Sequence, residues 1–578
     1  EEIPQGTKKI YIAFFVGNYI RANIKGGDYI DNTVRKNENS YSTVRDLLQL
    51  PKSGESKIAN FRLECKVENP QVYRRQFAPT PSISYLDTNK SKAQFELING
   101  NPKIIQDGLL NKLQGEVIDF TPADDKYVRI VVGKDSKDRF YTAYVPSWRK
   151  GTRGSDAGAK LEVTSDFVNF TTIWKGATGT DANGLVIPNF INILPMQVKE
   201  LGNGNLLVAT EYLRSDLPDN DGIANRANSF SGYFILSENH NTITQCQYTD
   251  FEGNLKPMNT THQVLSGATA YNNQIVYDWS TSIYNNIVVA TEYGSRYDEG
   301  IVWYSEDFGQ TFKQIFWMPN HYQDGVTNGD IVTYTHIHGV MYDYYRNRIY
   351  VIAGEANSNL FWSDKGINTT DADWNVQNIR RQMSRFKQLS YMQVVNGYPF
   401  RDCLVYGSDF ANMGAFMRVN RGKEGIVQRI EVAHEILPHF YSGTLYCAGG
   451  ITHRDQNAPV LMCITRENAM GTAEQQTEHM KKHLGRVIAT YDGFNFFEIW
   501  RDNTFGSHEV YNRKTSQIES REFAKCTRDM NAWLCENGDL VIKYSGRDFN
   551  YMTADYSEIV HGNFCSQIVR YKNVGRFL

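Results

Sequence analysis

The chain has 578 residues, too many for one simple hydrophobic core, so we expect two or more units. Hydrophobic residues make up 41% of the chain and charged residues 22%, which is a globular rather than a disordered composition. The net charge of -3 gives no reason to expect nucleic acid or an anionic membrane as a partner, and no apolar run approaches the ~20 residues that span a bilayer.

The first 124 residues read differently from the rest of the chain. Lys9–Val16 predicts a strand, and Tyr41–Leu50 predicts a short helix that opens on a Ser/Thr cap. Residue 1 is Glu rather than Met, so we expect either a processed or trimmed amino terminus or a further segment before Glu1. Residues 1–124 are predicted to form a small α+β or β domain for attachment, with a hinge at Thr121–Asp125.

From Tyr127 onward, short apolar runs alternate with Gly/Asn/Asp turns, which predicts an all-β region over residues 125–578. Six of these runs each lead into a polar loop, and the first two share Val-Ala-Thr-Glu-Tyr. The runs begin at Leu206, Ile287, Ile349, Cys403, Leu445 and Leu540.

Six equivalent strands in roughly 450 residues give ~75 residues per unit, enough for a four-stranded propeller blade with its loops. We therefore expect a six-bladed β-propeller. Seven blades is the alternative, because the runs at Tyr127–Val132 and Phe140–Val145 could form a blade of their own or be closed by Gln567–Tyr571.

One turn carries a recognisable spacing. Ser305, Asp307, Gly309 and Phe312 follow the strand Ile301–Tyr304 in the pattern Ser-x-Asp-x-Gly-x-x-aromatic. Ser and Asp side chains accept hydrogen bonds from turn amides, and Gly supplies a positive φ. The motif resembles the Asp-box, or BNR repeat, that links the third and fourth strands of a blade in sialidase-like β-propellers.

Degenerate copies of this turn recur along the chain. Thr164–Trp174 and Thr490–Trp500 share Thr, Asp, Asn, Phe, Ile and Trp in register, with Asp166 and Asp492 at the Asp position, and Phe361–Gly366 is a shortened copy. Repeats spread over the chain favour radially arranged units. Ordinary hairpin turns rich in Asp and Gly are the alternative interpretation.

Because connections between antiparallel strands alternate between the two ends of a blade, the polar loops after the six runs should lie opposite the Asp-boxes. The resemblance implies that the working site lies on that face. Its loops can hydrogen-bond hydroxyls and carboxylates, and Tyr rings can stack on sugars. A solvated rim of ordinary charges is the alternative. The candidate ligand-binding residues are Glu211, Tyr212, Arg214, Asp216, Glu292, Tyr293, Arg296, Asp298, His336, His338, Arg454, Asp455, Arg547 and Asp548.

The sequence predicts no metal and no cofactor. His336 and His338 share one face of a strand, but no third ligand is evident, which favours hydrogen-bonding or core histidines. His479 and His483 lie on a predicted inserted helix, Ala473–Leu484, without the Glu that zinc-protease chemistry needs. None of the eight cysteines forms a CxxC pair, so buried free thiols are expected.

Sialidase chemistry, as the resemblance implies it, needs three arginines on a carboxylate, a Tyr nucleophile beside a Glu, and an Asp acid/base. Arg129 in Tyr127-Val-Arg-Ile130 is similar to the early Arg-Ile-Pro strand of that family, with Val131 in place of Pro. Glu211, Arg214, Glu292 and Arg296 could serve, but no complete set can be assigned in order.

We therefore favour a non-catalytic glycan-recognition or structural propeller, extracellular or part of a virion tail, that binds a glycan or surface receptor. It could also assemble with other structural chains or with itself. A sialidase-like exo-glycosidase acting on surface glycans is the alternative, and a purely structural propeller is a third reading.

Overall fold

The computed structural model describes residues 95–98, 101–104, 115–124, 127–146, 160–175, 190–214, 229–260, 281–292, 300–321, 337–353, 359–378, 393–409, 417–420, 428–429, 445–446, 459–464, 485–494, 497–502, 504–512, 515, 517–523, 525, 531–543, 549–552, 559–562 and 566–573. The chain divides into two compact units, Glu1–Gln76 and Phe77–Leu578. The expected strand Lys9–Val16 and the expected helices Tyr41–Leu50 and Ala473–Leu484 lie outside the described residues.

Six sheets of the second unit are each built around four consecutive antiparallel strands, and we number them blades 1 to 6. Blade 1 contains β4 (Tyr127–Lys134), β5 (Phe140–Pro146), β6 (Lys160–Thr164) and β7 (Thr171–Lys175). Blade 2 contains β8 (Phe190–Glu200), β9 (Leu206–Arg214), β10 (Ser229–Leu236) and β11 (Ile243–Gln245). Blade 3 contains β15 (Thr281–Tyr284), β16 (Ile287–Thr291), β17 (Ile301–Ser305) and β18 (Thr311–Trp317).

The other three of these sheets follow the same order. Blade 4 contains β19 (Ile337–Asp343), β20 (Arg348–Ala353), β21 (Asn359–Ser363) and β22 (Asn375–Asn378). Blade 5 contains β23 (Gln393–Pro399), β24 (Cys403–Asp409), β25 (Met417–Asn420) and β26 (Gln428–Arg429). Blade 6 contains β27 (Leu445–Tyr446), β28 (Val460–Ile464), β29 (Arg486–Thr490) and β30 (Phe497–Arg501).

A further sheet joins strands that are far apart in the sequence, and we call it the closing blade. Its strands, from the inside outward, are β33 (Asn531–Leu534), β34 (Leu540–Lys543), β37 (Gln567–Tyr571) and β3 (Glu116–Asp119). The indole N–H of Trp500 in blade 6 donates to the Tyr571 hydroxyl at 2.9 Å. On the other side, the Ser566 hydroxyl accepts from the Arg129 amide of blade 1 at 2.9 Å and donates to the Arg129 carbonyl at 3.0 Å.

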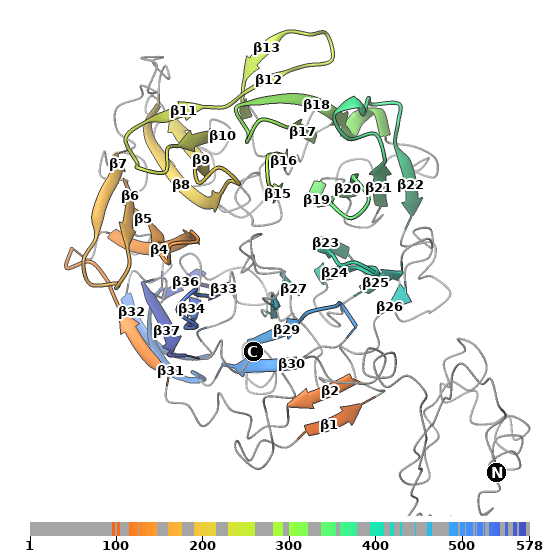
Figure 1. The fold of residues 1–578 in the computed structure, drawn as a ribbon. Coiled ribbons are helices and arrows are strands. Elements are labelled where there is room, and N and C mark those ends of the chain that lie inside the picture. The colour runs from red at the N-terminus through yellow and green to blue at the C-terminus, as the bar shows by residue number, and fades with distance from the viewer. Residues whose placement is uncertain are drawn as a thin grey trace, which may run out of the picture. The chain divides into compact units, whose positions relative to one another are not determined.

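Figure 1 shows blades 1 to 6 and the closing blade following one another around a common centre, with the first strand of each of blades 1 to 6 nearest the middle. The all-β propeller expected from the sequence is confirmed. Each of the six predicted runs lies in a different sheet, namely blades 2 to 6 and the closing blade. The run at Tyr127–Val132 opens a blade of its own, while Gln567–Tyr571 pairs with β3 to close the ring. Because β3 lies at residues 116–119, the propeller takes in residues before its predicted start at 125.

The hydrophobic core lies between neighbouring sheets. Side chains of blades 1 and 2 form one cluster around Val128, Leu161 and Val208, and blades 3 and 4 form another around Tyr304, Phe316 and Val351. A sheet that packs on both faces needs apolar residues at successive positions rather than at alternate ones. This explains why the second strands of the blades read as short continuous apolar runs. Among the described cysteines, Cys246, Cys403, Cys463 and Cys535 are buried free thiols, as expected.

Several strands are added to this frame. β12 (Gln247–Thr249) pairs in parallel with β18 and carries β13 (Leu255–Pro257) on its outer side, and β14 (Asn259–Thr260) pairs with β10. β1 (Phe95–Ile98) and β2 (Asn101–Ile104) form a hairpin near β30. Two short 3-10 helices span Met318–His321 and Gly366–Asn368. None of the described residues forms a helix long and apolar enough to cross a membrane.

One of the six apolar runs lies at a different position in its blade from the one predicted. The run that begins at Leu445 is the first strand of blade 6, because β27 pairs only with β28, and β28 is the strand that lies second. Leu461 and Cys463 of β28 are fully buried. The run Val-Leu-Met-Cys-Ile is therefore buried on both faces, as a second strand is. The prediction had taken the run at Leu445 for the second strand of this blade.

Candidate functional site

The turn after β17 shows the hydrogen bonds expected from its sequence. The Ser305 hydroxyl donates to Asp307 Oδ1 at 2.6 Å and accepts from the Gly309 amide at 3.0 Å. Asp307 accepts from the Thr311 amide at 2.9 Å. Gly309 has a φ of +77°, which a glycine adopts without strain. Phe312 is buried in the cluster that side chains of blades 2 and 3 form, so the turn and the core fix each other.

Two other turns between third and fourth strands share this pattern. The Thr164 hydroxyl accepts from the Phe167 amide at 2.9 Å, and Asp166 accepts from the Asn169 amide at 2.8 Å. In blade 6, the Gly493 amide donates to the Thr490 hydroxyl at 3.0 Å, and the Phe494 amide donates to Asp492 at 2.8 Å. The three Asp side chains therefore bind amides of their own turns. The residue after each Asp has positive φ: 61° at Phe167, 62° at Phe308 and 72° at Gly493.

The shortened copy in blade 4 is stabilised differently. The Ser363 hydroxyl lies 2.9 Å from the Thr369 hydroxyl, and Asp364 accepts from both ends of the Arg348 guanidinium, with 2.9 Å between Nη2 and Oδ2. The indole N–H of Trp374 then donates to the Ile315 carbonyl of blade 3 at 3.0 Å. This turn therefore links two neighbouring blades.

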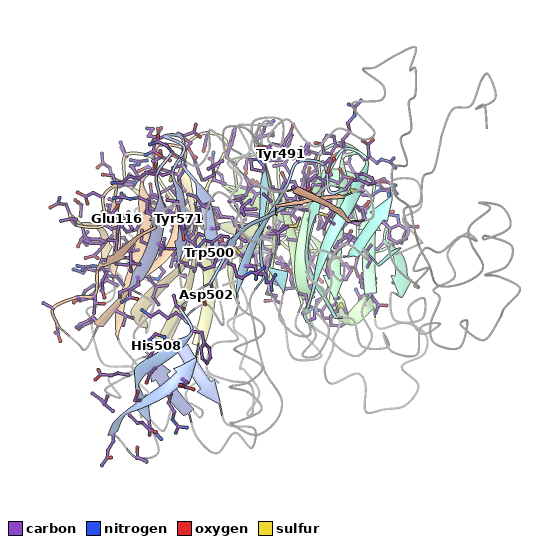
Figure 2. All side chains as sticks on the ribbon, turned by 90° about the horizontal axis from the view of Figure 1, so that it is seen from below. Glu116, Tyr491, Trp500, Asp502, His508 and Tyr571 are labelled. Atoms are coloured by element: carbon purple, nitrogen blue, oxygen red, sulfur yellow. The ribbon has the colours of Figure 1, made fainter. Side chains whose placement is uncertain are left out.

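These turns define one end of the propeller, which we call the Asp-turn end. Connections from first to second strands and from third to fourth strands lie there, since the strands of each blade alternate in direction. Connections from second to third strands, and from one blade to the next, lie at the other end, which we call the ligand end. Figure 2 shows Tyr491, in an Asp turn, at one end of the blades and Asp502, after β30, toward the other.

The repeated Val-Ala-Thr-Glu-Tyr has a structural explanation at its threonine. The Thr210 hydroxyl donates to the Gly232 carbonyl at 3.0 Å, and the Thr291 hydroxyl donates to the Ile301 carbonyl at 2.9 Å. In each blade the bond runs from the second strand to the third, and both threonines are buried. Each threonine therefore ties together the two strands from which a loop of the ligand end emerges.

Glu292, the next residue in the second copy, organises its own loop. Its side chain is fully buried, and Oε1 accepts from the Gly300 amide at 2.9 Å and the Ile301 amide at 3.1 Å. These amides lie where the chain re-enters the blade as β17. Glu292 therefore closes the base of the loop that carries Tyr293, Arg296 and Asp298 in the sequence.

Arg129 lies in the first strand of blade 1, where the resemblance places an early arginine. Its Nε donates to Glu162 Oε2 at 2.7 Å, and Nη1 donates to the Phe120 carbonyl at 3.3 Å. The guanidinium carbon lies 4.1 Å from the ring centre of Phe170. Glu162 is buried in β6, so the ion pair connects two strands of blade 1. The bond to the Phe120 carbonyl also connects Arg129 to the residue that follows β3 of the closing blade. Arg139 pairs in the same local way with Asp135, at 2.6 Å.

Of the remaining candidate residues, some are described with their side chains, some by their backbone alone, and some not at all. His338 is buried in β19, and no group of three or more metal-ligating side chains occurs among the described residues. For Glu211, Tyr212 and Arg214 the backbone is described, at the end of β9. The others lie outside the described part of the chain. They are Asp216, Tyr293, Arg296, Asp298, His336, Arg454, Asp455, Arg547 and Asp548.

The strand order nevertheless sorts their loops. The connections that carry Asp216, Arg296 and Arg547 follow second strands and belong to the ligand end. Arg454 and Asp455 fall between β27 and β28, a connection from a first to a second strand that begins and ends at the Asp-turn end. Their expected equivalence to the other Arg/Asp pairs rested on the run at Leu445, which is a first rather than a second strand.

The order of strands within the blades also identifies two loops that the prediction from the six apolar runs did not include. The connection from β5 to β6 carries Arg149, Arg153 and Asp156, and the connection from β28 to β29 carries Arg466 and Glu467. Both follow second strands and so emerge at the ligand end. The signal was present in Phe140–Pro146 and Val460–Ile464, which are apolar runs followed by basic and acidic residues.

A small additional sheet is inserted at the ligand end. It contains β31 (Gly506–Asn512), β32 (Gln517–Phe523), β35 (Phe549–Met552) and β36 (Ile559–Gly562), in the order β32-β31-β36-β35. The first hairpin lies between blade 6 and the closing blade, and the second lies between β34 and β37, so both leave the propeller at the same end. Figure 2 shows His508 of this sheet beyond the ends of the blades.

Buried Asp502 anchors this additional sheet. Its amide donates to the Gly485 carbonyl at 2.8 Å, and its carboxylate accepts from the Thr504 amide at 2.8 Å. The Thr504 hydroxyl in turn accepts from the Lys525 amide at 2.8 Å, beyond the hairpin. Both ends of the first hairpin are thereby fixed to the propeller, and the ligand end has a wall on one side.

Solved structures that resemble this chain include several sialidases. No protein-family profile and no curated protein matches the chain. A Trypanosoma rangeli sialidase in complex with 2,3-difluorosialic acid is 7% identical, with a TM-score of 0.32, over 80% of this chain and 59% of that chain. The chain thus spans about three fifths of the length of that sialidase.

Two trans-sialidases match in a similar way. The leech intramolecular trans-sialidase is 10% identical over 81% of this chain and 71% of that chain, with a TM-score of 0.32. The Ruminococcus gnavus intramolecular trans-sialidase is 10% identical over 80% of this chain and 97% of that chain, with a TM-score of 0.32. The propeller architecture of this chain is shown by the pairing of its own strands, and the role of each residue has to be read from its own contacts.

Proposed function

We propose that this chain is a non-catalytic glycan-recognition propeller whose ligand binds at the ligand end. The proposal is supported by the direction of β9, β16 and β34, which lead in the sequence to Arg214, Arg296 and Arg547 and which all end away from Asp307 and the other Asp turns. Arginine side chains donate several hydrogen bonds in a fixed geometry to hydroxyls and carboxylates, and neighbouring tyrosines can stack on sugar rings.

The non-catalytic part of the proposal rests on one observation: the Arg129 side chain is already bonded to other residues of this chain. Sialidase-type hydrolysis needs an arginine at this place that is available to a substrate carboxylate. Here the Arg129 guanidinium bonds to Glu162 and to the Phe120 carbonyl and lies against Phe170. Turning the guanidinium from these partners toward a substrate would leave the buried Glu162 carboxylate without that partner, which is costly.

The experiment measures binding and hydrolysis on the same protein. Binding is tested on an array of sialylated and desialylated oligosaccharides, and hydrolysis with 4-methylumbelliferyl N-acetylneuraminic acid. Arg214→Ala and Arg296→Ala should each weaken binding about tenfold or more, because each removes charged donors worth ~1.5–3 kcal/mol per bond. Arg348→Ala is the matched control, since Arg348 pairs with Asp364 at the Asp-turn end.

Hydrolysis that is lost in Arg129→Ala and Arg296→Ala would establish the alternative, a sialidase-like exo-glycosidase. Binding unaffected by both ligand-end variants would reject recognition at this end and leave a structural propeller. The proposal also places the chain outside the cell, on a cell surface or as part of a virion tail, where it meets a glycan or surface receptor. Antibody labelling of intact cells and of purified particles from the source tests this location.

A further inference from the structure

Three tyrosine rings from two neighbouring blades form a stacked row at the Asp-turn end. Tyr284 ends β15, and Tyr344 and Tyr345 follow β19. The ring centres of Tyr284 and Tyr344 are 4.2 Å apart with 3° between their planes, and those of Tyr344 and Tyr345 are 4.3 Å apart with 34°. We call these three residues the tyrosine row. Both turns join first to second strands, so the row lies opposite the ligand end.

The row is held in place from beneath and at its outer end. The Tyr344 hydroxyl donates to the Tyr345 hydroxyl at 3.1 Å, and the Tyr345 amide donates to Asp343 Oδ1 at 3.1 Å. Tyr342 is buried below the row, with its ring centre 6.3 Å from that of Tyr284. Burial raises the pKa of Tyr344, so its hydroxyl stays neutral across the physiological range. The rings therefore need little ordering before a ligand arrives.

Tyr345 is nevertheless 45% exposed, an unusual degree for a tyrosine in a stack. The residues beside it in the two turns are polar and exposed, namely Asn285, Arg346 and Asn347. The surface thus combines an aromatic ring with amide and guanidinium groups around it. A pyranose ring has the matching chemistry, with C–H groups on its face and hydroxyls at its edge. Asn347 is held in place because its Oδ1 accepts from the Tyr342 hydroxyl at 2.8 Å, and an apolar protein segment that covered this exposed residue would displace its water without replacing the hydrogen bonds.

We propose that the tyrosine row is a second carbohydrate-binding site, which takes a pyranose with one face of C–H groups, such as a β-galactoside. The sugar would stack on Tyr345 while its hydroxyls bond to side chains of the two turns. This site goes beyond the proposed function and is independent of it, because the two sites lie at opposite ends of the blades. Together they would let one propeller engage two glycan chains.

The test uses the full chain and measures binding of lactose, maltose and chitobiose at millimolar concentrations by saturation-transfer NMR and calorimetry. Tyr345→Ala should weaken lactose binding about tenfold, the factor that corresponds to 1.4 kcal/mol, because it removes the stacking surface. Tyr345→Phe should stay within about twofold of the parent, since it keeps the ring. Phe251→Ala is the control, because Phe251 is an exposed aromatic residue of the outer β12–β13 hairpin.

Three results would overturn the proposal. The first is that none of the three sugars binds. The second is that Tyr345→Ala and Phe251→Ala reduce binding equally. The third is that Tyr345→Ala abolishes self-association rather than sugar binding, which would make the row a contact between copies. Arg296→Ala distinguishes the two proposed sites. If lactose binding is retained in Arg296→Ala and lost in Tyr345→Ala, the tyrosine row is supported even when glycan recognition at the ligand end fails.

Discussion

Replacing Asp307 by Ala tests whether the Ser305–Phe312 turn is structural, as its hydrogen bonds indicate. The carboxylate accepts from the Thr311 amide at 2.9 Å, the Thr311 hydroxyl at 2.5 Å and the Ser305 hydroxyl at 2.6 Å. Burial alone would raise the pKa of Asp307, but these hydrogen bonds outweigh it and hold the pKa below its usual value. The ionised carboxylate is therefore the form that stabilises the turn.

The size of the effect follows from where the released groups lie. Thr311 is exposed, so water can replace the lost acceptor, and the cost is that of a lost cap rather than of a buried unsatisfied amide. We expect Asp307→Ala to lower the free energy of unfolding by ~1–2 kcal/mol. Asp307→Asn keeps one oxygen acceptor and should lose about half as much.

Guanidinium unfolding followed by tryptophan fluorescence measures this change, because Trp303 is buried in β17 directly before the turn. Gln310→Ala shortens an exposed side chain of the same turn and should stay within about 0.5 kcal/mol of the parent. An unchanged unfolding midpoint in Asp307→Ala would refute the reasoning. So would a loss of ligand binding with unchanged stability, since it would give Asp307 a functional role.

Three further predictions concern the second strands and the acid limit of stability. Thr291→Val should lower the free energy of unfolding by about 1 kcal/mol in urea titrations, because it deletes the bond to the Ile301 carbonyl but keeps the side-chain volume. Glu292→Ala should cost about 3 kcal/mol, since two amides lose a buried acceptor, whereas Glu292→Gln should recover more than half of that loss in the same titrations. Amides of Asn169 and Val168 lower the pKa of Asp166, and Lys365 and Thr370 lower that of Asp373 to about 2. Both folded pKa values lie below the unfolded value, so their contribution is present above about pH 4 and lost as the pH falls, and unfolding midpoints should drop toward about pH 3.

The fold was predictable where local chemistry and repetition agree. The turns at Asp166, Asp307 and Asp492 follow from residues that bond within four positions of each other, so their geometry is encoded locally. The continuous apolar second strands follow from burial on both faces. Both patterns can be recognised in a single sequence because neither depends on a residue far away in the chain.

The parts that escaped prediction depend on distant partners. β3 is recognisable only through β37, and the strand at Glu116–Asp119 has three exposed residues out of four. The run at Leu445 contains Tyr and Gly and is less apolar than Val460–Ile464, and the pairing of Val460–Ile464 with β29 shows which of the two runs lies second in the blade. Arg129 looked available from its sequence because its partner Glu162 lies in another strand, 33 residues away. The loops of the ligand end were placed by topology, and their side chains remain predictions.

The closing blade has a consequence for the order in which the protein folds. The Arg570 guanidinium bonds to Glu116 across 454 positions of sequence, so the ring cannot close until the chain has been synthesised through Arg570. Such distant pairing slows folding, because loop entropy is lost before the contact is gained. A nascent chain that ends before Gln567 would hold β3 and β34 with open edges, and open edges recruit other strands. Ribosome stalling or truncation near the carboxyl end should therefore favour exchange of β3 between chains over soluble monomers.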